Sequence, residues 1–111
     1  MINYDNRTFR SVQTSLTSEV TEETTFIYQQ EGRVVSAVYN GGPILFGQLI
    51  ATMNDEGELD MRYHHINMYG ELKTGICHAI PEILSNGKIR LHEKWRWTSE
   101  EGEGESVVEE V

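Results

Sequence analysis

The amino-acid sequence predicts an all-β protein: a single up-and-down antiparallel meander of about eight strands that closes into a small barrel. Turn sequences containing glycine recur about every 10 to 17 residues. The segments between them are rich in Val, Ile, Tyr, Phe, Thr and Trp, the residues that strands prefer. No window shows a sustained 3.6-residue apolar repeat, so the pattern does not favour helices.

The length of the chain fits this architecture. With 111 residues the sequence has room for one domain, which we place at residues 1–111. About eight strands of roughly ten residues each, turns included, use nearly all of it. An open meander would leave two exposed edges, and closure into a barrel removes both.

The elements follow in order between the turns. The expected strands cover residues 7–13, 23–30, 33–40, 44–53, 58–67, 71–80, 88–98 and 105–110. The expected glycine turns lie at 30–32, 40–43, 54–57, 68–71 and 85–88. Polar residues 14–22 predict a loop or a short turn of helix. Pro81 predicts an irregular link because it cannot donate to a strand ladder. An acidic, flexible loop is expected near residues 99–105, which are rich in glutamate.

The charge balance is acidic, with 18 Asp and Glu against 9 Lys and Arg and a formal net charge of −9. Such a chain repels phosphate backbones and anionic lipid, so we expect neither a nucleic-acid partner nor a membrane partner. The single cysteine, Cys77, cannot form an internal disulfide, and the first residues show no signal-peptide pattern. We therefore expect a bacterial-type cytoplasmic protein.

Side chains alternate across a strand, so bulk and charge assign the inner face. Strand 88–98 is clearest, because its basic residues alternate with an apolar set. The expected inward residues there are Ile89, Leu91, Glu93, Trp95 and Trp97. Glu93 is thus an acid in an apolar row, and a buried acid needs a partner or a proton.

The same reasoning assigns three more strands. For 58–67 the inward set is Leu59, Met61, Tyr63, His65 and Asn67. For 71–80 it is Leu72, Thr74, Ile76, His78 and Ile80, and for 44–53 it is Ile44, Phe46, Gln48, Ile50 and Thr52. Strand 44–53 is apolar on its other face too, which suggests a homodimer contact through this strand.

The candidate ligand-binding residues are the larger and more polar members of these inward sets. They are Phe46, Tyr63, His65, His78, Glu93, Trp95 and Trp97. The aromatic residues would wall a pocket, while His65, His78 and Glu93 would orient a polar group of the ligand. The same polar residues could instead form a satisfied network that fixes strand register. We expect no metal and no cofactor, since Cys77 and His78 point to opposite faces of a regular strand.

The sequence contains neither a Gly-x-Ser-x-Gly nucleophile motif nor a glycine-rich phosphate loop before a helix. We therefore expect a non-enzymatic barrel that binds a small, partly apolar molecule. Two alternatives stay open: an enzyme that uses Glu93 or His78 as a general base, and a filled barrel that serves as a structural or self-association module.

Residues 47–50, 61–65, 70–77 and above all 86–99 carry a family resemblance. Over about residues 1–111 the chain resembles small bacterial β-barrel proteins that often bear the label N-acetylglutamate synthase. This resemblance implies an acyl- or acetyltransferase activity, but no catalytic residue can be carried over from it. The meander also looks like lipocalin and avidin barrels, an analogy of fold only.

Overall fold

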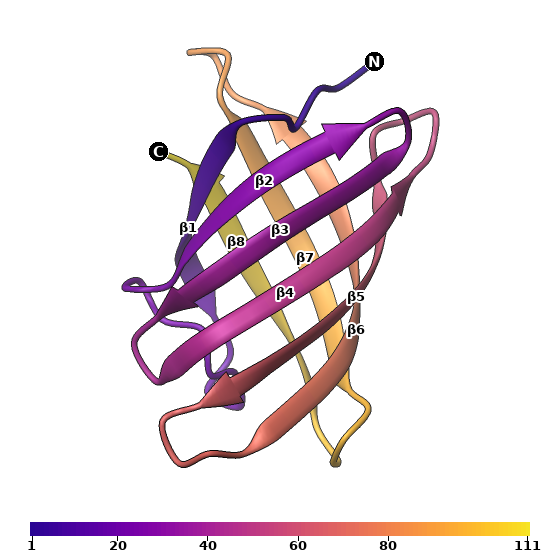
Figure 1. Ribbon diagram of the computed structural model, residues 1–111. Helices are drawn as coiled ribbons and strands as arrows, with labels where there is room; N and C mark the ends of the chain where they lie inside the picture. Colours follow the sequence, from indigo (N-terminus) through magenta and orange to yellow (C-terminus); the bar gives the residue numbers. More distant parts are fainter.

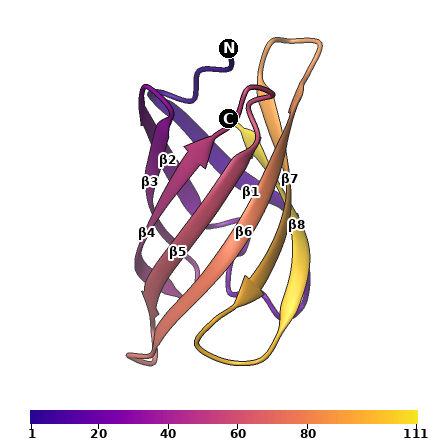
Figure 2. The same ribbon diagram turned by 90° about the vertical axis from the view of Figure 1, so that its right-hand side faces the viewer.

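The computed structural model describes residues 1–111 as eight strands and the loops between them (Figures 1 and 2). The strands are β1 (Arg7–Thr14), β2 (Thr25–Glu31), β3 (Val34–Gly41), β4 (Ile44–Met53), β5 (Leu59–Asn67), β6 (Leu72–Ile83), β7 (Ile89–Trp97) and β8 (Glu103–Glu110). All neighbours pair antiparallel in sequence order. The structure contains no helix long and apolar enough to cross a membrane.

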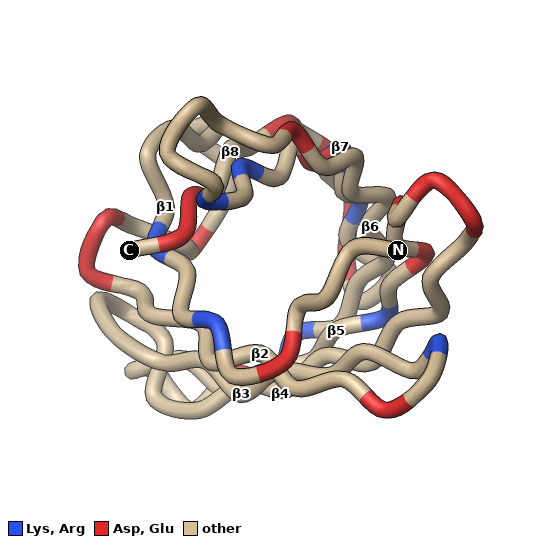
Figure 3. The backbone as a smooth tube through the Cα atoms, turned by 90° about the horizontal axis from the view of Figure 1, so that it is seen from above, with Lys and Arg blue, Asp and Glu red and all other residues tan.

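The sheet closes because β1 pairs with β8, with Phe9 opposite Glu110 and Arg10 opposite Glu109. Figure 3 looks along the barrel and shows the backbone as a ring. The predicted all-β meander that closes into a barrel is therefore confirmed. The prediction rested on edge removal, and the β1–β8 pairing satisfies the backbone groups that an open sheet would expose.

Two of the predicted boundaries are wrong. Pro81 does not interrupt β6, which runs to Ile83 and pairs Pro81 with Leu91 of β7. The pairing of β5 with β6 ends at Leu59 and Ala79, so Pro81 lies where β6 has no β5 neighbour to receive an N–H. The acidic loop is also shorter than predicted, because Glu103 already belongs to β8 and pairs with Arg96.

The predicted inner faces of β5 and β7 are confirmed. Leu59, Met61, His65 and Asn67 are buried on β5, as are Ile89, Leu91, Trp95 and Trp97 on β7. Tyr63 is half-buried and packs against the core.

The predicted inner face of β6 is wrong. The inward residues are Gly75, Cys77 and Ala79, while Leu72, His78 and Ile80 are exposed and Thr74 and Ile76 share their outward parity. Across the sheet these small residues face large ones: Gly75 lies opposite Tyr63 and Trp97, and Cys77 opposite Met61 and Trp95. The rings fill the interior, so only small residues fit on β6.

On β4, Ile44 is buried as predicted, but Phe46, Gln48, Ile50 and Thr52 point outward. The register shifts between Ile44 and Phe46 where β4 pairs with β5, which is the signature of a β-bulge. A bulge inserts one residue and so reverses the parity of everything after it. Gly47, Leu49, Ala51 and Met53 consequently face the interior.

One end of the barrel is closed by the N-terminal segment, at the top of Figure 1. Tyr4 is fully buried there, and its hydroxyl donates to the carbonyl of Gly57 at 2.6 Å. The Tyr4 backbone N–H donates to Gln30 Oε1 at 2.8 Å. The opposite end carries the β1–β2, β3–β4, β5–β6 and β7–β8 connections, and we call it the cavity end.

Three interior rings each lie opposite a glycine of the next strand: Tyr39 opposite Gly47, Tyr63 opposite Gly75, and Trp95 opposite Gly104. A Cβ built on Gly104 would lie 2.6 Å from Trp95 Cζ2, and Cβ atoms on Gly47 and Gly75 would collide with the tyrosine rings. Each ring therefore occupies the space that a side chain on the facing glycine would fill.

We expect Gly75→Val to lower the free energy of unfolding by about 1–3 kcal/mol, because the new side chain displaces the Tyr63 ring. Urea unfolding at fixed pH measures this loss. The matched control is Gly32→Asn, since Gly32 has a φ of 61° that asparagine tolerates and has nothing within 4 Å. Equal losses in both variants would contradict the packing explanation.

Candidate ligand-binding site

A cavity lies inside the barrel and extends toward the cavity end. Its lining comes from β2 to β8 and from the β1–β2 loop: Ser18, Val20, Phe26, Tyr39, Leu49, Met61, Tyr63, His65, Cys77, Glu93, Trp95, Trp97 and Ser106. About 50 Å³ is open to the centres of water-sized molecules. One water needs about 10–15 Å³ measured in this way, so a few waters or a small organic group fit.

Aromatic rings form much of the wall. The Trp95 and Trp97 centroids lie 5.6 Å apart with an interplanar angle of 64°. Tyr63 meets Trp97 edge-on at 5.8 Å, and Phe26 packs against Tyr39 at 4.9 Å. Such tilted contacts hold each ring in a fixed orientation. The cavity therefore has flat, rigid, apolar walls.

Glu93 contributes a carboxyl group to the lining. Its Oε1 accepts a hydrogen bond of 3.0 Å from the hydroxyl of Ser106 on β8, and Glu93 takes part in no ion pair. Burial raises the pKa of the Glu93 carboxyl to about 7, while the Ser106 hydrogen bond opposes the shift. Near neutral pH the cavity thus holds a carboxyl that is poised between its two protonation states.

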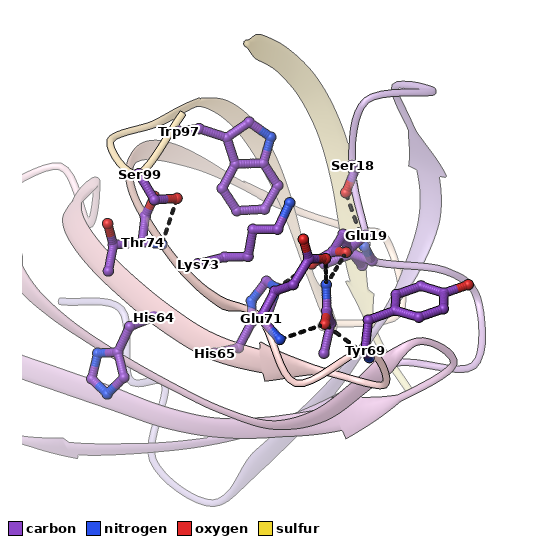
Figure 4. A network of polar contacts seen from close by, with 12 residues as sticks. Ser18, Glu19, His64, His65, Tyr69, Glu71, Lys73, Thr74, Trp97 and Ser99 are labelled. Atoms are coloured by element: carbon purple, nitrogen blue, oxygen red, sulfur yellow. Dashed lines mark hydrogen bonds and ion pairs between the residues drawn. The ribbon is translucent and has the colours of Figure 1, made fainter. Parts of the chain in front are cut away.

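His65, which lines the cavity, lies beside Glu19 of the β1–β2 loop (Figure 4), and we call this end of the cavity its mouth. Glu19 Oε1 accepts from His65 Nε2 at 2.8 Å, and Oε2 accepts from Asn67 Nδ2 at 2.8 Å. The His65 Nδ1 is hydrogen-bonded to the Tyr39 hydroxyl at 3.0 Å. Burial raises the pKa of the Glu19 carboxyl, but the hydrogen bonds from His65 and Asn67 outweigh it and bring the pKa below its usual value.

The β1–β2 loop, residues 15–24, covers the cavity at the cavity end. Ser18 and Val20 line it directly, and the Trp97 indole N–H donates to the carbonyl of Thr17 at 3.3 Å. Glu19 of the same loop reaches across to His65 and Asn67 of β5. The loop thus contributes two lining residues and these three hydrogen bonds to this end of the barrel, although none of its residues belongs to a strand.

Comparison with known families shows where this barrel belongs. Residues 2–111 match the avidin-like protein family. The chain belongs to the avidin-like protein family. No curated protein and no solved structure matches it significantly. The avidin-like barrel is consistent with binding of a small molecule. None of the comparisons supports the resemblance to N-acetylglutamate synthase.

The structure of this avidin-like protein brings together five of the seven sequence-predicted ligand-binding residues. Those that line the cavity are Tyr63, His65, Glu93, Trp95 and Trp97. The predicted inward placement of the other two is wrong. His78 is exposed and lies 3.5 Å from Glu58, because the inner face of β6 holds only small residues. Phe46 is 51% exposed, because the β4 bulge turns it outward.

The outward placement of His78 separates it from Glu93, so the avidin-like barrel does not pair these two residues as acid and base. No group of three or more His, Cys, Asp or Glu side chains is placed to hold a metal ion. Cys77 also lines the cavity, and burial raises the pKa of its thiol.

Sequence reasoning missed several lining residues of the avidin-like cavity. The main ones are Phe26, Tyr39, Leu49, Cys77 and Ser106. Tyr39 lies on β3, a strand to which the sequence analysis assigned no inner face, although its alternating set Val35, Ala37 and Tyr39 is the more apolar one. The sequence does contain a signal for Tyr39. The 40–43 turn makes a hairpin in which Tyr39 pairs with Gly47, and an aromatic residue opposite a glycine favours a ring that points into the interior.

Glu93 makes the stability of this avidin-like protein depend on pH. Its folded pKa of about 7 lies above the ordinary value of 4.5, so protons bind the folded state more tightly. The contribution of Glu93 to the free energy of unfolding is therefore fully present below about pH 4.5 and is lost as the pH rises through about 7. Between about pH 5 and about pH 8 we expect the wild type to lose about 2–3 kcal/mol relative to Glu93→Gln.

Urea unfolding of both proteins at the two pH values gives this difference directly. Glutamine keeps the shape of the side chain and does not titrate, so all other groups cancel in the comparison. Parallel stability profiles for the two proteins would show that Glu93 is ionised in both the folded and the unfolded state.

Proposed function

We propose that the barrel binds a small, partly apolar molecule in the cavity that Trp95, Trp97 and Glu93 line. One observation carries the proposal: the core of the barrel is incompletely filled, and the open space touches both aromatic faces and polar atoms. A filled barrel would be packed to native density, with no void of this size. Ligand sites in small barrels have this composition of apolar walls with few polar groups.

The polar atoms in and around the cavity support a ligand with at least one hydrogen-bonding group. The Trp95 indole nitrogen and the Tyr28 hydroxyl are buried without a hydrogen-bond partner. Only one oxygen of Glu93 has a partner, the Ser106 hydroxyl. Buried polar groups without partners destabilise a fold by about 1–3 kcal/mol each, so a ligand or water that satisfies them gains affinity.

Native mass spectrometry tests the proposal on protein purified gently from its own cells. We expect an added mass that disappears on denaturation. Cys77→Met fills the cavity from β6 and should abolish the added mass, because methionine extends into the open space. His78→Met places the same side chain on the outer face of the same strand and should retain it. Retention of the adduct by Cys77→Met would place the ligand elsewhere.

We propose, as a second function, that two copies associate through the outer face of β4. Residues 34–53 contain no charged side chain in a chain whose net charge is −9. On this face Leu45, Phe46 and Ile50 are 58%, 51% and 58% exposed, beside Val38 of β3. Two copies that meet there keep their acidic residues apart and bury apolar surface, so a second copy fits this face better than a charged partner.

Sedimentation equilibrium tests this association. We expect the wild type to form dimers and Ile50→Lys to shift the equilibrium to monomer by at least tenfold, because each copy then brings a like charge to the contact. Val12→Lys is the matched control, since Val12 is an exposed apolar residue on the distant strand β1. A monomeric wild type, or equal dissociation of both variants, contradicts this interface.

We further propose a cytoplasmic location. The support is Cys77, the single cysteine of the chain, which is free and buried.

A further inference from the structure

We propose that the ligand of this cavity is a small organic cation, an alkylammonium group held between the Glu93 carboxylate and the surrounding aromatic faces. This inference rests on the proposed binding function and adds the charge of the ligand. Three independent features of the structure support it: the unmatched carboxyl, the aromatic walls, and the charge of the loops around the mouth.

The first feature is that Glu93 has no countercharge. The protein groups that face it are the Ser106 hydroxyl and, further away, the side chains of Tyr28, Tyr39, Tyr63 and Cys77. Burial raises the pKa of each of those three phenols and of the thiol, so all four are neutral near pH 7. A cation in the cavity would supply the positive charge that the barrel itself lacks.

The second feature is the arrangement of the rings. Faces of Trp, Tyr and Phe attract a cation that lies within about 6 Å of the ring centroid. The structure already uses this contact at the mouth, where Lys73 Nζ lies 5.5 Å from the centroid of Trp97 (Figure 4). A ligand cation inside the cavity would meet Trp97, Trp95 and Tyr63 from the interior.

The third feature is the charge around the mouth. The four connections at the cavity end, residues 15–24, 42–43, 68–71 and 98–102, contain no Lys or Arg. Their acidic residues are Glu19, Glu22, Glu23, Glu71, Glu100 and Glu101. Lys73 at the start of β6 pairs with Glu100 at 2.7 Å and offsets one of them. This field concentrates cations at the entrance and repels anions.

The size of the cavity limits the ligand. Space for a few water molecules accommodates an ammonium group with a short alkyl chain, or such a group at the end of a larger molecule whose remainder lies outside. A small free amine and the ammonium end of a larger molecule present the same chemistry to Glu93. If the ligand is a small free amine, short amines bind. If it is the end of a larger molecule, affinity rises strongly with the length of the alkyl chain.

The experiment compares three probes of similar size and different charge: propylammonium, 1-propanol and propanoate. Trp95 and Trp97 are the only tryptophans and both line the cavity, so their fluorescence reports occupancy. At pH 8 we expect propylammonium to bind at least tenfold more tightly than 1-propanol, and propanoate not to bind. Hexylammonium, which has a longer chain, distinguishes the two sources.

The pH dependence follows from Glu93. With a pKa of about 7, roughly a tenth of the carboxyl is ionised at pH 6 and roughly nine tenths at pH 8. The affinity for propylammonium should therefore rise about tenfold between these values. The other titratable pair at the cavity is His65 with Glu19, and any pH dependence left in Glu93→Gln belongs to that pair.

Glu93→Gln should remove the preference for propylammonium over 1-propanol. Glu31→Gln makes the same change of charge on an exposed residue of β2 at the opposite end of the barrel and should keep it. Equal affinity of the wild type for the two probes, or no binding of propylammonium, overturns the cation inference. Binding of 1-propanol that Cys77→Met abolishes would in that case still support the proposed binding function.

Discussion

The fixed interior volume of a closed eight-stranded barrel governs the rest of this structure. Once the strands close, each large side chain that points inward must be matched by a small one on a neighbouring strand. Tyr63 and Trp97 share the space over Gly75, and Tyr39 lies over Gly47. The glycines therefore decide where the rings lie, and the rings decide where space is left open.

The open space lies at one end because the two ends are closed differently. The N-terminal segment fills one end with the buried ring of Tyr4, which is anchored to the carbonyl of Gly57. The other end is covered by a loop whose contacts are mainly polar, from Glu19 to His65 and Asn67. A polar cover fills less volume than an aromatic plug, so the cavity opens toward this end.

Hydrophobic alternation predicted the fold and the inner faces of β5 and β7, because those strands carry their bulk on one side. It failed on β6, where the bulky residues Leu72, Ile76 and Ile80 point outward and small residues point inward. The size of the inward side chains on one strand depends on the side chains of the neighbouring strands, so the sequence of a single strand does not reveal it. The β4 bulge is a second limit, since one inserted residue reverses parity for Phe46 and the residues beyond it.

Glu93 shows that packing and strand register alone do not explain the composition of the core. A glutamine at this position would accept the same hydrogen bond from Ser106 and would avoid the loss of stability that ionisation brings above neutral pH. A register-fixing network therefore needs the polar atoms but not the charge. The charge becomes useful when a cation occupies the space beside it. The carboxyl, the acidic mouth and the aromatic walls then act on the same ligand, each through a different physical interaction.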